Sequence, residues 1–104
     1  MTKLSIANKN FEIEVKSISD EEIKIKLKTS DTSYFKHDLD IINKNDKMLL
    51  AVYLRNYAYS LKIDDQVYEF YYPINIRKSR QTGYRILTLQ KYHKPNEENK
   101  WQLG

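Results

Sequence analysis

The sequence predicts an all-β fold, a small antiparallel barrel or sandwich of about seven to eight strands in a meander-like order. Three observations support this prediction. Apolar and polar residues alternate with a period of two in several short stretches, polar turns separate most of these stretches, and 104 residues suffice for one hydrophobic core. We therefore expect a single β-rich domain over residues 1–104, in which residues 93–104 form a polar C-terminal tail anchored by Trp101.

Composition excludes several classes of protein. The absence of cysteine excludes disulfides, thiolate metal sites and cysteine nucleophiles. With 40% hydrophobic residues, two Gly and two Pro, the chain is neither disordered nor collagen-like. The longest apolar run, residues 48–54, is too short to cross a bilayer, and the polar N-terminus lacks the apolar core of a signal peptide. We therefore expect a cytoplasmic protein with no membrane partner.

Two segments near the N-terminus show the clearest alternation, after a first short strand at residues 3–6. Residues 11–15 alternate apolar residues with glutamates, and residues 22–28 alternate isoleucine and leucine with lysines. We expect these two segments to form an antiparallel hairpin, because this arrangement buries one face of both. The register that pairs every apolar residue places Phe11 opposite Leu27, Ile13 opposite Ile25 and Val15 opposite Ile23.

The same register pairs opposite charges on the other face of the hairpin. It places Lys16 opposite Glu22, Glu14 opposite Lys24 and Glu12 opposite Lys26. Glutamates therefore face two of the three lysines at positions 24, 26 and 28. We interpret this lysine triad as a solvated, self-compensating surface rather than as a binding surface.

Residues 34–42 also alternate, and we predict a strand there, with a short helix as the alternative. His37 falls on the apolar side of this segment. A histidine in that position is more often a hydrogen-bonded rim residue than a metal ligand, and no cysteine or second nearby histidine accompanies it. We therefore expect no metal site and no cofactor.

Residues 48–54 are apolar on both faces, so periodicity fits either a central strand or a helix that begins at Asn45 or Asp46 and ends near Ser60. The strand alternative explains more of the sequence. Turns at residues 55–56 and 64–65 give three strands one shared apolar face. The expected pairs are Leu54 with Tyr57, Val52 with Tyr59, Leu50 with Leu61, Met48 with Ile63, Leu61 with Tyr68, Tyr59 with Phe70 and Tyr57 with Tyr72.

The C-terminal part of the chain predicts one more hairpin. Pro73 falls near the end of a strand, where an edge tolerates the missing backbone donor. Residues 75–83 form a loop in which Gly83 can adopt a positive φ, and residues 84–92 form the last clear strand. If Leu87 and Leu89 mark its inward face, the outward side chains are those of Tyr84, Ile86 and Tyr92, together with Tyr71.

The positive charge of the protein is local. The formal net charge is +4, yet residues 1–66 hold 11 Lys/Arg and 11 Asp/Glu, whereas residues 67–104 hold 7 and 3. No acidic residue occurs between Arg77 and Lys94. A local excess of this kind creates a field that attracts an anionic partner.

We predict that residues 67–94 form a basic hairpin that binds nucleic acid, with a single strand favoured over the groove of a duplex. Aromatic side chains stack on bases while cations neutralise phosphates, and arginine serves both contacts. The predicted nucleic-acid-binding residues are the cations Arg77, Lys78, Arg80, Arg85, Lys91 and Lys94 and the tyrosines Tyr71, Tyr84 and Tyr92.

Two alternative functions use the same surface. A protein-binding module, an inhibitor or adaptor, relies on exposed Tyr and Arg, which dominate protein interfaces. A metal-independent ribonuclease needs a proton shuttle and cations near the reacting phosphate, which the set His93, Tyr92, Arg80 and Arg85 can supply. Two glycines do not make a phosphate-cradling loop, and no spacing supports a Ser/His/Asp triad. We therefore predict a binding protein rather than an enzyme.

Overall fold

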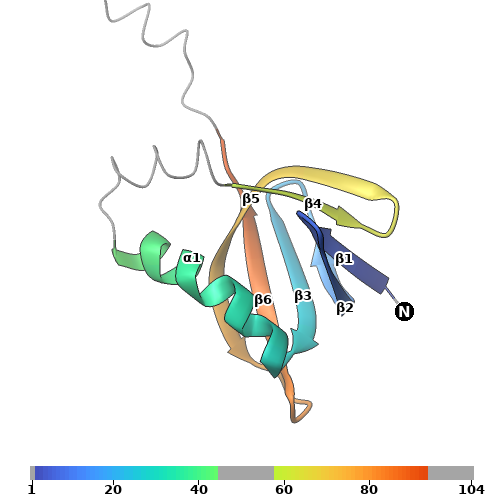
Figure 1. The fold of residues 1–104 in the computed structure, drawn as a ribbon, viewed down its shortest axis with the longest axis vertical. Helices are drawn as coiled ribbons and strands as arrows, with labels where there is room; N and C mark the ends of the chain where they lie inside the picture. Colours follow the sequence, from blue (N-terminus) through green and yellow to red (C-terminus); the bar gives the residue numbers. More distant parts are fainter. Residues whose placement is uncertain (1, 45–57, 94–104) are drawn as a thin grey trace, which may run out of the picture.

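The structure is a computed structural model that describes residues 2–44 and 58–93. Within these ranges, antiparallel strands close into a six-stranded barrel in the order β1-β2-β3-β6-β5-β4, and β4 pairs back with β1 (Figure 1). The elements are β1 Thr2–Ile6, β2 Lys9–Ile18, β3 Glu22–Lys28, a 3₁₀ helix Thr29–Thr32, α1 Ser33–Lys44, β4 Tyr59–Ile63, β5 Gln66–Lys78 and β6 Tyr84–Lys91. The prediction of an all-β barrel is confirmed, with six strands in the described residues instead of seven to eight.

The β2–β3 hairpin forms, but the predicted register is wrong by two residues up to Val15. The structure pairs Ile13 with Leu27, Val15 with Ile25 and Glu14 with Lys26, and a bulge follows Val15. A shift of two keeps every side chain on its predicted face, so the hydrophobic alternation cannot detect it. The turn decides the register: the Ser19 amide donates to the Glu22 carbonyl at 2.8 Å, and the Glu22 amide donates to Ser19 Oγ at 3.1 Å.

The predicted strand at residues 34–42 is wrong, because this segment lies in α1. Phe35 and Leu39 are apolar at a spacing of four residues, which fits a helix face as well as it fits a strand face. Both side chains are buried, whereas Lys36 and Asp40 are exposed. His37 is also exposed on the helix, so the predicted place on an apolar face is wrong too.

Helix α1 packs against β5 (Figure 1) and completes the hydrophobic core. Phe35 is fully buried, and its ring centroid lies 5.8 Å from that of Phe11 and 6.0 Å from that of Tyr59. The Tyr59 hydroxyl donates a hydrogen bond to the Asp38 carboxylate, which ties α1 to β4. Phe35 and Leu39 therefore belong to the same apolar cluster as the barrel side chains, Leu4, Ile6, Phe11, Ile13, Ile23, Ile25, Leu27, Leu61, Ile63, Tyr71, Leu87 and Leu89.

The long strand β5 bends and serves two ladders. Its first half pairs with β4 and its second half with β6, and Tyr71 has partners in both, Tyr59 and Lys91. Phe70, directly before this corner, has a φ of 64°. The predicted pair of Leu61 with Tyr68 is confirmed, but the predicted pair of Tyr59 with Phe70 is wrong, because the ladder shifts between Tyr59 and Ser60.

The second half of β5 is longer than predicted. Pro73 lies inside the strand opposite Leu89, and the register shifts between Pro73 and Asn75. A bulge is one of the few places where a strand interior tolerates a residue with no backbone donor. The predicted loop at residues 75–83 therefore shortens to residues 79–83, in which Gly83 has a φ of 87° as expected. The predicted strand at residues 48–54 and its pairs, the pair of Tyr57 with Tyr72 and the Trp101 anchor lie outside the described residues.

Candidate nucleic-acid interface

Three predicted cations lie together where β5 turns into β6. Arg77 and Lys78 are the last two residues of β5, and Arg80 lies in the loop that follows. All three side chains are exposed, and none forms an ion pair with a residue in the ranges 2–44 and 58–93. Tyr84 begins β6 at the same end and is half-buried. We call these four residues, together with Lys28, the basic hairpin end.

Lys28 joins this group because of the pairing between β3 and β6, in which it lies opposite Tyr84. Its side chain is exposed and has no ion-pair partner in the described part of the chain. Two residue pairs away on the same ladder, Lys26 lies opposite Ile86, and Ile86 lies opposite Arg77 of β5. Lysines of β3 and Arg77 of β5 thus flank the outer face of β6.

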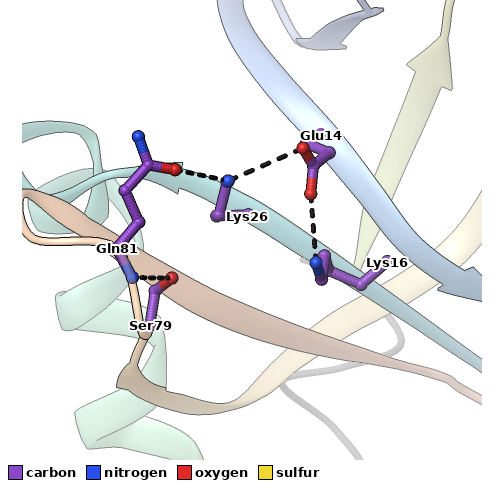
Figure 2. A network of polar contacts seen from close by, with 5 residues as sticks. All are labelled: Glu14, Lys16, Lys26, Ser79 and Gln81. Carbon is purple, nitrogen blue, oxygen red and sulfur yellow. Dashed lines mark hydrogen bonds and ion pairs between the residues drawn. The ribbon is translucent and has the colours of Figure 1, made fainter.

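A network of polar contacts holds the hairpin loop against β3 (Figure 2). Lys26 Nζ donates a hydrogen bond to Gln81 Oε1 at 2.7 Å and lies 3.6 Å from Glu14 Oε1. The backbone amide of Gln81 donates a hydrogen bond to Ser79 Oγ at 3.1 Å. The side chain of Lys26 is only 16% exposed, and its ammonium lies 5.2 Å from the centroid of the Tyr84 ring. These contacts fix the loop and the Tyr84 ring in place, which pre-orders the surface.

The lysine triad on β3 is only partly self-compensating. Lys26 pairs with Glu14, and Lys24 pairs with Glu22 of its own strand at 3.7 Å. Lys28 is left without a carboxylate partner among the described residues. Lys24 and Lys26 are paired as predicted, but with other glutamates than expected, Glu22 and Glu14, because the predicted register was two residues off.

Glu14 is the anion at the centre of this network. Its pKa is lowered from the ordinary value of 4.5, mainly because Lys16 donates a hydrogen bond to it at 3.1 Å and adds a positive charge beside it, with a smaller effect of the Lys26 charge. Because this pKa is lower in the folded protein than in the unfolded chain, the Glu14 carboxylate stabilises the fold at pH values above its unfolded pKa. This stabilisation is lost as the pH falls through the folded pKa.

A Glu14→Gln variant therefore should unfold at a lower temperature than the parent protein at pH 7, and the difference should shrink as the pH falls from about 5 towards 3. Thermal unfolding followed by circular dichroism at several pH values measures this. The effect is small because Glu14 is exposed to solvent. Glu12→Gln, on the same face of β2, is the matched control. A difference that stays constant across this pH range would contradict the role of the Glu14 carboxylate.

A groove of about 450 Å³ lies beside this network on the β2–β3 side of the loop. Its charged lining residues are Glu12, Glu14, Lys26 and Lys28, two acids and two bases. Gln81 and Tyr84 also line it, so the groove is continuous with the basic hairpin end. The acidic and basic side chains that line the groove cancel in charge, and the cations of the basic hairpin end lie beside it. The groove therefore offers room for a neutral, planar group next to a phosphate that those cations bind.

Several predicted site residues do not join this surface. Tyr71 is 4% exposed and Tyr92 is 9% exposed, so the prediction that both rings point to solvent is wrong. Tyr71 lies at the β5 corner, and burial raises its pKa above 10.0, with smaller contributions from Tyr68, Glu21 and Asp20. Ile86 lies on the outward face of β6 as predicted, opposite Lys26 and Arg77, yet its side chain is only 8% exposed.

The remaining predicted cations lie elsewhere. Arg85 pairs with Leu27 and Lys78 in the ladders, which places it on the inward side of β6, next to α1. Lys91 is exposed at the far end of β6, opposite Tyr71. Lys94 lies outside the described residues. The sequence thus found the cations of the hairpin but could not separate the two faces and two ends of β6.

The set proposed for RNA cleavage is not assembled in this structure. His93 Nε2 lies 2.5 Å from Glu21 Oε2, beyond the last residue of β6, whereas Arg80 and Arg85 lie at its start. At about 3.3 Å per residue, the length of β6 separates His93 from Arg85 by about 25 Å. Within residues 2–44 and 58–93, no group of three His, Asp or Glu side chains is placed to hold a metal ion. No helix in these ranges is long and apolar enough to span a membrane.

Comparisons with models of protein families, with curated proteins and with solved structures gave no match. Sequence reasoning missed Lys26 and Lys28, and no local signal could have assigned them, because the pairing of β3 with β6 joins segments more than fifty residues apart in the chain.

Proposed function

We propose that the basic hairpin end binds single-stranded nucleic acid. The observation that carries the proposal is a group of exposed cations that have no carboxylate partner among the described residues and lie at the same end of the barrel as the half-buried Tyr84, namely Lys28, Arg77, Lys78 and Arg80. Cations next to an aromatic ring are the combination that holds a single strand, because phosphates meet the charges and a base stacks on the ring.

The groove beside Tyr84 supports a single strand rather than a duplex. Bases of a single strand are free to leave the stack and enter a protein groove, whereas those of a duplex are paired. The groove has balanced charge and about 450 Å³ of space, and Tyr84 lies on its wall. A strand that follows the cations therefore places its bases towards the groove.

Binding of fluorescently labelled single-stranded DNA and RNA tests the proposal. Anisotropy titrations should show an affinity whose logarithm falls with the logarithm of salt concentration, with a slope of about −3 for four phosphate contacts. The triple variant Arg77→Gln, Lys78→Gln and Arg80→Gln should bind more weakly and reduce the magnitude of the slope by about 2.

The control is a triple variant of the same charge, Lys3→Gln, Lys62→Gln and Lys91→Gln, which removes exposed lysines from other parts of the barrel. It should keep most of the affinity and the slope. Absence of binding at low salt, or an equal loss of affinity in both triple variants, would contradict the proposal. An unlabelled duplex should compete less well than an unlabelled single strand.

Protein binding is a second candidate, and one observation favours it. Ile18, Val67 and Phe70 are large apolar side chains that are 43%, 54% and 36% exposed. They lie outside the basic hairpin end, in β2 and in the first half of β5. Because Tyr71 and Tyr92 are buried, neither ring is available to anchor a protein interface. The salt series separates the two functions, because apolar contacts survive the salt concentrations that weaken binding to a polyanion.

A further inference from the structure

A second groove, of about 390 Å³, lies between α1 and the strands β5 and β6. Its volume lies in the range of pockets that hold small molecules. Lys36, Asp40 and Asn43 line it from the helix, and their spacing of four and three residues places them on one face of α1. Across the groove lie Asn75 of β5 and Arg85 of β6.

Arg85 is the residue that this groove leaves unsatisfied. Its position opposite Leu27 and Lys78 directs it to the side of β6 that carries Leu87 and Leu89. The side chain is half-buried and makes no hydrogen bond or ion pair with any residue in the described ranges. A guanidinium stays protonated in a protein, so its partial desolvation is unfavourable until an anion compensates for it.

The charges around Arg85 favour an anionic ligand. Lys36 adds a second cation and Asp40 adds one carboxylate, which leaves the lining with a net charge of +1. Asp40 forms no ion pair with Lys36 or Arg85, so no carboxylate in residues 2–44 and 58–93 neutralises either cation. A phosphate monoester fits such a site, because guanidinium groups bind phosphate oxygens through two parallel hydrogen bonds.

The other lining residues indicate which chemical group could accompany the phosphate. Leu39, Ile74 and Ile76 give the groove apolar surface, while Asn43 and Asn75 contribute two amides, each with donors and an acceptor. Apolar surface with amides beside it suits a planar heterocycle whose edge carries hydrogen-bonding groups. We propose that this groove binds a nucleoside monophosphate, with the phosphate at Arg85 and Lys36 and the base near Asn43 and Asn75.

Arg85 lies on the other face of the sheet from Arg77, although Lys78 of the basic hairpin end is its partner in the ladder. Arg85 and Arg77 lie on opposite faces of the sheet, because Arg77 pairs with the outward Ile86 and Arg85 with the inward Leu27. The proposal therefore does not depend on strand binding. A free mononucleotide and the 5′-phosphorylated end of a strand share the same chemistry, so both are included in the test.

The test is a titration of the isotope-labelled full chain with adenosine 5′-monophosphate, followed by amide chemical shifts in NMR spectra. Saturable shifts should centre on Leu39, Asn43, Asn75 and Arg85. Adenosine without phosphate should bind at least about tenfold more weakly, and Arg85→Gln should weaken the monophosphate by about tenfold or more. Asp40→Asn should bind it more tightly than the parent protein, because a like charge leaves the site.

Lys91→Gln is the matched control, since it removes one positive charge at the far end of β6, and its affinity should equal that of the parent protein. The double variant Arg77→Gln and Arg80→Gln should also keep its affinity for the monophosphate, whether or not the protein binds strands. A 5′-phosphorylated oligonucleotide that competes better than the mononucleotide assigns the site to strand ends, and weaker competition assigns it to free nucleotides.

Three results would overturn the proposal: no saturable shift in the groove at millimolar monophosphate, equal affinities for adenosine and its monophosphate, or equal affinities of Arg85→Gln and Lys91→Gln. If Arg85→Gln fails to fold, Asp40→Asn carries the test alone. Asp40 is exposed and forms no ion pair with another described residue, so this variant should fold, and unchanged or weaker binding by it would reject the site.

Discussion

A Phe35→Ala protein should lose about 3 to 5 kcal/mol of unfolding free energy, the usual loss for a buried phenylalanine. Phe35 is fully buried, and its ring lies 5.8 Å from Phe11, 5.1 Å from Tyr34 and 6.0 Å from Tyr59, measured between centroids. The substitution leaves a cavity between α1 and the barrel that these rings cannot fill without moving. Urea denaturation followed by circular dichroism measures the loss.

The matched control for this prediction is Val67→Ala, because Val67 is 54% exposed and its truncation should change the free energy of unfolding by no more than about 0.5 kcal/mol. A loss of that small size in Phe35→Ala would mean that α1 does not pack on the barrel in solution. The residues of the second groove on α1 would then have no fixed position relative to Arg85.

The barrel itself was predictable because its evidence is local. Apolar and charged residues alternate at 11–15 and 22–28, so each segment needs one buried face and one face exposed to water, whichever strands it pairs with. Helix α1 was not predictable on the same grounds, since Phe35 and Leu39 satisfy both the strand period and the helix period. Only the tertiary contacts with Phe11 and Tyr59 distinguish the two.

The candidate site also has one part that the sequence predicts and one part that depends on the fold. A stretch without acidic residues guarantees that Arg77, Lys78 and Arg80 have no nearby partner along the chain, and the structure keeps them unpaired among the described residues. Which other residues join them depends on non-local pairing, and Lys28 reaches the site only through β6.

The orientation of the tyrosines depends on irregularities that alternation does not encode. The register shifts between Tyr59 and Ser60, where Phe70 is the extra residue of β5 and has a positive φ, and it shifts again after Pro73. Each irregularity re-aims the side chains that follow it. Tyr71 consequently lies in the corner of β5 and is buried, although continuous alternation would have placed it outside.

Replacement of Tyr71 and of Tyr84 by alanine should therefore have opposite consequences. Tyr71→Ala should lose about 3 kcal/mol or more of unfolding free energy, because it removes a buried ring next to Tyr68. Tyr84→Ala should lose much less stability, since the ring is half-buried, but it should weaken single-strand binding by about fivefold to 150-fold, the value of one stacked base.

Tyr71→Phe distinguishes packing from hydrogen bonding at the corner. No hydrogen bond of the Tyr71 hydroxyl to a described residue is present, so the phenylalanine variant should retain nearly the stability and the strand affinity of the parent protein. Urea denaturation and anisotropy titration of the three variants, at a temperature where all remain folded, measure both quantities. A folded Tyr84→Ala protein with full affinity would remove the ring from the interface, because a stacked base cannot lose its platform without a loss of binding energy.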